Sequence, residues 1–468
     1  MRLSRTLLAA AIAVALTACA STDTRVPEVE LPPANAATVA GIDRWWTQFN
    51  DPQLTALIEE TLAANLDLRI AVARIEEARA NLRLARSYQL PAIDADAGAA
   101  RARRSDATEP RFPGPLITNS YGAGLNVAYE VDLWGRLSAG TTAAQSTLLG
   151  TRYNAETVRT VLAAQMASAY FQLLTYDAEL RLSRDTLATR VESVNLQKDR
   201  FDAGLIGDYE LRLAEAERAT VAASVPPLQR AVAQTEAAIA VLAGRSARAV
   251  FTPSVARSPD LKVDDAGPIV PEGLPSDLLA RRPDIRQAEA DLVAANARIT
   301  EARAQYFPAI SLTARLGSES SELGDLFSGP ALVWSVAGSV FQPVFGAGRI
   351  ASQVEAATSR REQAEYAYVR SVQGAFLDAH DALVAHRTAR DSYVAQEDRR
   401  AQFAEALRLA EMRYTAGYTS YIEVLDNQRN LLDAERARLL ALRARQSALV
   451  DLYKALGGGW SPEQFAQR

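Results

Sequence analysis

Apolar and polar residues alternate strictly over residues 121–133. Every second residue there is apolar, and residues as polar as Asn126, Glu130 and Asp132 lie between them. A period of two predicts a β-strand with one apolar and one polar face. A similar alternation predicts a second strand over residues 332–340. Shorter partner strands are predicted at 93–97 and 310–316.

Two much longer stretches predict helices. Residues 140–203 and 351–416 contain no proline, and their only internal glycines are Gly150 and Gly374. At 1.5 Å per residue each helix would be roughly 95 Å long, which exceeds any compact domain. We therefore expect two extended helical hairpins.

The return helices of these hairpins are predicted to begin near Asp208 and Tyr421. Leucines at positions 425, 432 and 439 form a seven-residue seam of the kind that packs one helix on another. Pro226 and Pro227 should break or kink the first return helix, because proline lacks the amide donor that a helix interior requires. Shorter helices, at 54–87 and 283–305, precede the two strand pairs.

The chain contains this plan twice. Asp67 aligns with Asp284 and Ile93 with Ile310, a constant offset of 217 residues without a gap. Further along, Arg136 aligns with Arg349 and residues 200–204 with 413–417, an offset of 213. The offset changes from 217 to 213 between Ile93 and Arg136, where a surface loop can differ in length between the two copies. A period this long indicates two large repeats, not a solenoid of short ones.

The strands alone allow two interpretations. They form either two ordinary half-buried hairpins or four strands of a transmembrane barrel, with apolar residues toward lipid and polar residues toward a lumen. Four strands cannot close a barrel with a lumen. The second interpretation therefore requires several chains to pool their strands.

The N-terminal residues have the pattern of a secretory signal. The apolar run 6–16 follows Arg2 and Arg5 and is too short to span a bilayer, which takes about 20 residues. It ends at Leu-Thr-Ala-Cys19, which resembles a bacterial lipobox. We expect Cys19, the only cysteine, to be acylated. The resemblance to a lipobox further implies that Ala20 after it, not Asp, favours outer-membrane sorting.

Several motifs, in this order, are similar to the TolC-type outer-membrane factor family, specifically its lipoprotein branch that serves drug-efflux pumps. The most distinctive are Arg281-Arg282-Pro283-Asp284-Ile285 and Leu456-Gly457-Gly458-Gly459-Trp460. The others are Trp45-Trp46, Phe49-Asn50-Asp51-Pro52, Ala63-Ala64-Asn65-Leu66-Asp67-Leu68, Tyr129-Glu130-Val131-Asp132-Leu133-Trp134-Gly135-Arg136, Ala302-Arg303-Ala304 and Phe307-Pro308.

The resemblance implies an α+β, mostly α chain, internally duplicated, whose helical hairpins form an α-barrel. Four strands per chain would contribute to a twelve-stranded transmembrane β-barrel in a homotrimer. The implied function is the passive outer-membrane duct of a tripartite efflux pump that exports small molecules, including antibiotics. Its partners would be a periplasmic adaptor (membrane fusion) protein, an inner-membrane RND-type transporter and outer-membrane lipid. The chain would be lipid-anchored and extend into the periplasm.

The expected organisation follows the repeats. Residues 1–18 are a signal peptide, 19–50 a lipid-anchored tail, 51–253 the first repeat, 254–276 a Pro-, Asp- and Gly-rich linker, 277–456 the second repeat and 457–468 a C-terminal tail.

The hairpin turns are candidate functional residues. Each follows Ala-Gly, and glycine there can take the left-handed conformation that ends a helix. Plain capping chemistry accounts for part of the pattern. The resemblance implies that these turns contact the adaptor; they comprise Gly204, Leu205, Ile206 and Gly207, and Gly417, Tyr418, Thr419 and Ser420.

Acidic residues follow both turns. Glu423 and Asp426 are three apart, on one helix face, and Glu210 stands where Glu423 does in the other repeat. Carboxylates at a helix start are ordinarily favoured by the helix dipole. The resemblance implies instead a ring of carboxylates at a periplasmic gate that selects cations. The family's arginine after the second turn is replaced by Thr419, which leaves open what holds this entrance shut.

No catalytic site, resident metal or cofactor is expected. His380 and His386 lie on different helix faces, and no Gly-rich phosphate loop is present. A net charge of -5 argues against a nucleic-acid partner. Two other functions stay open: the duct of a type I protein secretion system, and a periplasmic coiled-coil structural lipoprotein without a pore.

Overall fold

A computed structural model describes residues 42–105, 107, 115–259 and 281–460. Within these ranges the chain divides into two compact units. The first comprises residues 74–152 and 287–369, and the second lies within 42–73, 153–286 and 370–460. Each unit therefore draws on both sequence repeats. Among the described helices, none has the length and apolarity needed to cross a membrane.

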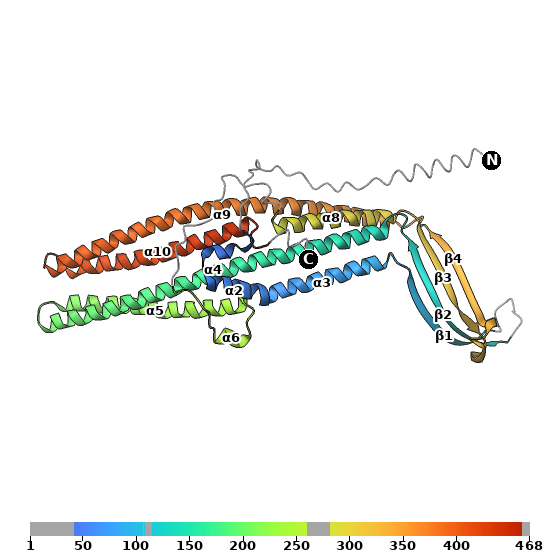
Figure 1. The fold of residues 1–468 in the computed structure, drawn as a ribbon, viewed down its shortest axis with the longest axis horizontal. Helices are drawn as coiled ribbons and strands as arrows, with labels where there is room; N and C mark the ends of the chain where they lie inside the picture. The colour runs from blue at the N-terminus through green and yellow to red at the C-terminus, as the bar shows by residue number, and fades with distance from the viewer. Residues whose placement is uncertain (1–41, 106, 108–114, 260–280, 461–468) are drawn as a thin grey trace, which may run out of the picture. The chain divides into compact units, whose positions relative to one another are not determined.

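The first unit contains one antiparallel sheet of four strands in the order β1-β2-β3-β4 (Figure 1). The strands are β1 (Ala92–Arg103), β2 (Ile117–Val131), β3 (Ala309–Ser320) and β4 (Leu332–Phe341). All four predicted strands are confirmed. The partner strands predicted at 93–97 and 310–316 are longer than expected, at 12 residues each. As predicted, β1 is shorter than the 15-residue β2, but β3 is longer than the 10-residue β4, so that part of the prediction is wrong.

The two faces of this sheet differ in chemistry. Cross-strand register places Leu125 of β2 beside Leu316 of β3 and Trp334 of β4 on one face. The opposite face carries polar residues, such as Asn126 beside Arg315. The sheet therefore has the one-sided apolar pattern that its alternating sequence predicts.

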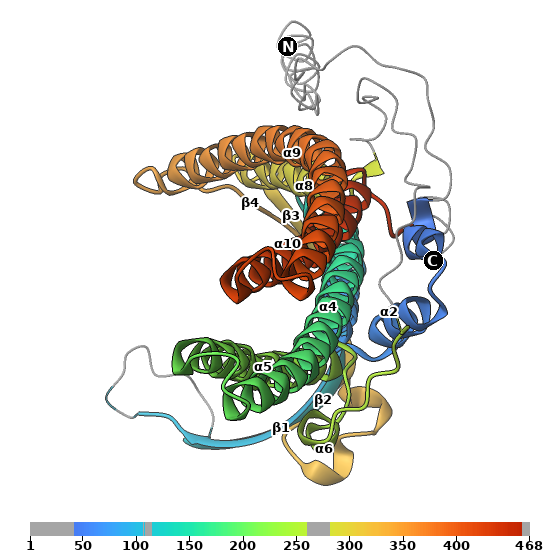
Figure 2. The same ribbon diagram turned by 90° about the vertical axis from the view of Figure 1, so that its left-hand side faces the viewer.

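Two long hairpins dominate the helical part of the chain. The first is α4 (Arg136–Asp202) with α5 (Asp208–Leu242), and the second is α9 (Arg349–Thr415) with α10 (Tyr421–Ala455). Figure 2 looks toward their turns and shows the two antiparallel pairs. The leucines of the predicted seam, Leu425, Leu432 and Leu439, are all buried.

The predicted break at Pro226 and Pro227 is wrong, since α5 continues through both. The two missing amide donors are adjacent, so the loss is confined to one turn, and the ladder of hydrogen bonds resumes on both sides. Within that turn, the Ser224 hydroxyl donates to the carbonyl of Val221 at 2.7 Å.

The first short helix is not continuous, contrary to the prediction of one helix over 54–87. It is divided into α2 (Pro52–Ala64) and α3 (Leu66–Ser87) by Asn65, which has extended backbone geometry. The Asn65 side chain accepts hydrogen bonds from the first amides of α3 and donates to the carbonyl of Leu242 at 2.8 Å. The break therefore combines a local cap on α3 with a contact to the distant end of α5. The second-repeat counterpart, α8 (Pro283–Ala304), is uninterrupted.

The largest core lies in the second unit and includes a segment expected to be a tail. The 3-10 helix η1 (Ile42–Phe49) buries Trp45, which stacks on Tyr453 of α10 with 5.6 Å between ring centroids. Trp460 and the glycines before it are buried as well. Parts of both expected tails are thus folded. The remaining short elements are α6 (Ala247–Phe251), η2 (Leu323–Asp325) and η3 (Gly329–Ala331).

The strand register confirms the duplication. Ala92 pairs with Ala128 in β1–β2, and adding the offsets of 217 and 213 gives Ala309 and Phe341, which pair in β3–β4. The correspondence holds along both hairpins as far as Arg101 with Asn119 and Ser318 with Leu332. The two copies therefore share one hairpin geometry.

Candidate functional site

The turns of both hairpins use one hydrogen-bonding pattern. The Leu205 and Tyr418 amides each donate, at 2.8 Å, to the carbonyl five residues before them. Gly204 and Gly417 have φ of 72° and 77°, in the left-handed region that favours glycine. This is the Schellman cap, which satisfies the last carbonyls of a helix. The predicted capping chemistry is confirmed in both repeats.

The caps present apolar side chains to solvent. Leu205 is 74% exposed and its repeat counterpart Tyr418 is 80% exposed. Tyr209 and Ile422, in the first turns of the return helices, are also exposed. Each chain therefore has two similar apolar tips. Around them, Gly207 and Ser420 take extended N-cap geometry before α5 and α10.

Arginines accompany the predicted carboxylates of the second hairpin. Glu423 accepts a hydrogen bond from Arg413 at 3.0 Å and another from the Thr419 hydroxyl. Asp426 lies 3.5 Å from Arg429. Arg413 and Arg429, which the sequence analysis did not single out, thus offset part of the negative charge. Thr419, at the position where the resemblance implies an arginine, contributes a hydroxyl donor.

A more buried ion pair connects the two hairpins. Arg429 of α10 donates to Glu217 of α5 at 2.7 Å, and the Glu217 side chain is only 5% exposed. The hydrogen bond to Glu217 raises the pKa of Arg429. Arg190 of α4 is buried beside them, and its burial lowers its pKa while the Glu217 charge acts in the opposite direction. Glu217 therefore pairs with Arg429 and also favours the charged form of Arg190.

An apolar and aromatic cluster strengthens this junction. Tyr414 of α9 accepts a hydrogen bond from Arg200 of α4 at 2.6 Å, and the guanidinium also lies 5.3 Å from the ring centroid. Tyr421 packs beside Tyr414, and burial raises its pKa. Leu425 and Ala214 are buried in the same cluster. Glu210, the remaining predicted gate residue, is half-buried at the start of α5.

A polar network crosses three strands on the polar face of the sheet. Arg315 of β3 lies 3.1 Å from the carboxylate of Asp96 on β1 and donates to Asn126 of β2 at 3.3 Å. Asn126 also donates to Asp96 at 2.6 Å. A Cβ atom added to Gly124 would lie 3.5 Å from the Arg315 guanidinium. Gly124 therefore lies beside the Arg315 guanidinium, at ordinary contact distance.

The motif at residues 129–136 forms the junction between β2 and α4. Glu130 and Arg136 make a bidentate ion pair, with distances of 3.0 and 2.7 Å. The Asp132 carboxylate accepts two amide hydrogen bonds at the start of α4, which satisfies donors that a helix leaves unpaired. Trp134 stacks on Phe307, before β3, with 4.7 Å between centroids. The motif thus connects the two repeats within the first unit.

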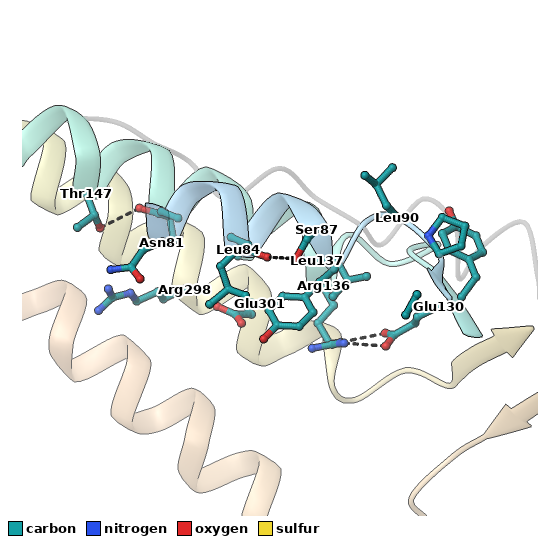
Figure 3. A pocket seen from close by; sticks show the side chains of 18 of the residues that line it. Asn81, Leu84, Ser87, Leu90, Glu130, Arg136, Leu137, Thr147, Arg298 and Glu301 are labelled. Atoms are coloured by element: carbon teal, nitrogen blue, oxygen red, sulfur yellow. Dashed lines mark hydrogen bonds and ion pairs between the residues drawn. The ribbon is translucent and has the colours of Figure 1, made fainter. Parts of the chain in front are cut away.

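A cavity of about 1330 Å³ adjoins this junction, between α3, α4, α8 and the ends of the strands (Figure 3). Charges of both signs line it, including Arg298, Glu301 and the Arg136–Glu130 pair. Leu84 and Leu90 add apolar surface. A lining of mixed charge and apolar surface is suited to contact with water, and no motif in the sequence indicates this cavity.

The histidines do not meet in a ligand cluster. His380 is exposed beside Asp381, whereas burial lowers the pKa of His386. Within the described ranges, no group of three or more His, Cys, Asp or Glu residues is arranged to hold a metal ion.

Comparison with known proteins decides among the functions that stayed open. Residues 57–245 and 274–458 match the family model described as "Outer membrane efflux protein". The chain belongs to this family. A probable efflux pump outer membrane protein of Pseudomonas putida, TtgC, is 36% identical over 92% of this chain and 88% of its own length. The cation efflux system protein CusC of Escherichia coli is 32% identical over 97% of this chain and 98% of its own.

A solved structure supports the assignment of this chain to the outer membrane efflux family. The CmeC outer membrane channel of Campylobacter jejuni superposes with a TM-score of 0.87, at 26% identity, over 94% of this chain and 96% of its own. The predicted α+β, mostly helical fold is confirmed, as are the outer-membrane location and the efflux function. The protein-secretion and pore-free alternatives are not supported. Cys19 lies outside the described residues, so its acylation stays a prediction.

Proposed function

We propose that three copies of this chain form a passive duct through the outer membrane. The observation that carries the proposal is the open sheet: among the described residues, β1 and β4 each have one edge without a partner strand. Unpaired backbone groups are costly in lipid, so a membrane-spanning sheet must close on itself. Four strands from each of three chains would close a twelve-stranded barrel, with the Leu125 face toward lipid and the Asn126 face toward the lumen.

The hairpins would continue the duct on the periplasmic side. Their exposed apolar tips, Leu205 and Tyr418, are suited to contact an adaptor protein, because exposed apolar patches mark interaction sites. The adaptor would connect the duct to an inner-membrane transporter of the proton-driven RND type. The relatives named above, which export through efflux pumps, support small-molecule cargo. Acylation of Cys19 would anchor each chain.

We further propose that Glu423 and Asp426 line the gate, and that Arg413 and Arg429 hold it closed. Threefold symmetry would bring three copies of each carboxylate near the axis. Their ion pairs at 3.0 and 3.5 Å leave a reduced negative charge, enough to favour cations. Because the second hairpin carries both carboxylates, it is the one expected to move on opening, and this movement would break the contact of α10 with α5 through Arg429.

The test is single-channel recording in planar bilayers. A Glu423→Gln/Asp426→Asn variant should lose cation preference and become less sensitive to block by divalent cations. An Asp398→Asn/Glu405→Gln variant removes the same charge from α9, away from the turn, and should behave as the unmodified protein does. Equal cation preference in both variants would exclude the proposed gate, and absence of conductance in the unmodified protein would exclude the duct.

A further inference from the structure

We propose that Arg101 and Arg103, at the end of β1 remote from the helices, bind a phosphate group of the glycolipid that forms the outer leaflet of the outer membrane. The inference rests on the proposed duct, in which the Leu125 face of the sheet contacts lipid. It adds a lipid-binding site, formed by two arginine side chains, to the outer edge of that face.

The lipid-facing side of the sheet has charged side chains at one edge only. Because residues alternate between faces, Arg101 and Arg103 lie on the same face of β1 as Ile93. Ile93 pairs with Val127, which shares a face with Leu125. Among the described strand residues, every other side chain on this face is uncharged at neutral pH. The charges described on the lipid-facing side are thus two arginines at its outer edge.

The apolar band on β2 has the height of a membrane. On this face every residue from Tyr121 to Val131 is apolar or aromatic. At about 3.4 Å per residue this stretch is roughly 34 Å long, and a strand tilt of about 40° reduces its height to about 26 Å. Transmembrane barrels have an apolar band about 25 Å tall, edged by aromatic residues. Tyr121 pairs with Ala99, so Arg101 is the next β1 residue beyond the band, at the level of the lipid headgroups.

Regular strand geometry holds both arginines in place. The Arg104 amide donates to the carbonyl of Leu116 at 2.7 Å, so the ladder of hydrogen bonds continues past Arg103. Both arginine side chains are exposed. Side chains two residues apart on one face are separated by about 7 Å, a distance over which two flexible guanidinium groups can converge on one phosphate. The pairing of β2 with β3 ends at Tyr121, so the arginines lie on a two-stranded extension of the sheet.

Charge complementarity identifies the occupant as a phosphorylated lipid. A guanidinium group presents a planar fork of donors that matches phosphate oxygens, and the apolar side chains next to it would contact the acyl chains of the same molecule. Arginines that only extend from hydrocarbon into water would suit either edge of the face. The edge near the helices is instead uncharged, at Ile93, Val131 and Ile310. The asymmetry favours the outer leaflet, whose glycolipid carries phosphates on its glucosamine rings.

Binding of lipid A, the phosphorylated lipid part of that glycolipid, tests the site. Native mass spectrometry of detergent-solubilised trimers, over a series of lipid A concentrations, gives the fraction of trimers with lipid bound. Arg101→Gln/Arg103→Gln should bind lipid A at least about tenfold more weakly than the unmodified protein, because it loses charged donors to phosphate. Arg101→Lys/Arg103→Lys keeps the charge without the planar fork and should retain part of the affinity.

Two comparisons accompany these variants. Arg83→Gln/Arg86→Gln removes the same charge from α3, where both side chains are exposed, and should bind lipid A as the unmodified protein does. Lipid A from which both phosphates have been removed should bind the unmodified protein as weakly as lipid A binds the Arg101→Gln/Arg103→Gln variant.

Equal affinity of the Arg101→Gln/Arg103→Gln variant and the α3 control for lipid A would overturn the site. Dephosphorylated lipid A or phosphatidylglycerol binding as tightly as lipid A would also overturn it, because the contact would then be apolar or a general attraction to anionic lipid. If the double variant does not assemble, Arg101→Gln alone tests the same contact by the same titration. Bilayer conductance is recorded on the same preparations: an unmodified protein that does not conduct refutes the duct, whereas conduction with unchanged lipid binding refutes only the site.

Discussion

The Glu217–Arg429 pair should hold the two hairpins of a chain together, and Glu217→Gln should weaken that hold. The variant keeps the shape of the side chain and a hydrogen-bond acceptor but removes the charge. Arg429 lies 2.7 Å from a carboxylate that is 5% exposed, and buried Arg190 relies on the same charge. The change thus leaves Arg429 without its carboxylate partner and removes one charge that favours the charged form of Arg190.

The structure sets the expected magnitude. Hydrogen bonds to charged groups contribute about 1.5–3 kcal/mol. Arg429 is 48% exposed, so solvent screening reduces this to roughly 1–2 kcal/mol. Since 1.4 kcal/mol is a factor of ten, the ratio of joined to separated hairpins should fall about 5- to 30-fold. In the proposed duct, separation of α5 from α10 accompanies opening.

Planar bilayer recording measures this ratio as the fraction of time spent conducting. Glu215→Gln is the matched control on the same helix, because Glu215 pairs with Arg212 where both side chains are exposed, and solvent-exposed ion pairs contribute little to stability. Glu217→Gln should conduct for much more of the time than Glu215→Gln. Combining Glu217→Gln with Arg429→Gln should give less than the sum of the separate effects. Equal open fractions for the two glutamine variants would refute the reasoning.

Three further predictions concern other parts of the chain. Asn65→Ala removes the cap of α3 and the hydrogen bond to α5, and should lower the unfolding free energy by roughly 2–3 kcal/mol. Thermal melting should show a lower midpoint, and an unchanged midpoint would contradict the role of Asn65. Gly417→Ala should destabilise the protein by about 1 kcal/mol, because alanine is strained at positive φ. Gly374→Ala, in open space within α9, should stabilise it by a similar amount. Thermal melting measures both changes, and a shift of the midpoint in the same direction for both variants would contradict the cap. Asp96→Asn should release Arg315 into the lumen and lower single-channel conductance, while Asp94→Asn, two residues along the same face, should not; matching conductances would rule the network out as a determinant.

Local pattern in the sequence was sufficient for several features. The duplication followed from matched positions such as Asp67 with Asp284, and the strand register reproduces its offsets. The alternation at 121–133 predicted a two-faced strand because side chains in a strand point alternately to either side. The turns at Gly204 and Gly417 were predictable because a left-handed cap needs glycine at one position.

Only the tertiary structure decided the features that depend on distant partners. Asn65 divides a helix because the carbonyl of Leu242 lies within its reach. The predicted carboxylates Glu423 and Asp426 have arginine partners, and Arg429 also pairs with a glutamate 212 positions away. Ion pairs between distant residues leave no periodic pattern in the sequence, because they depend on how the helices pack. The sequence by itself therefore determined the repeated elements and their faces, and packing determined which charges those elements bring together.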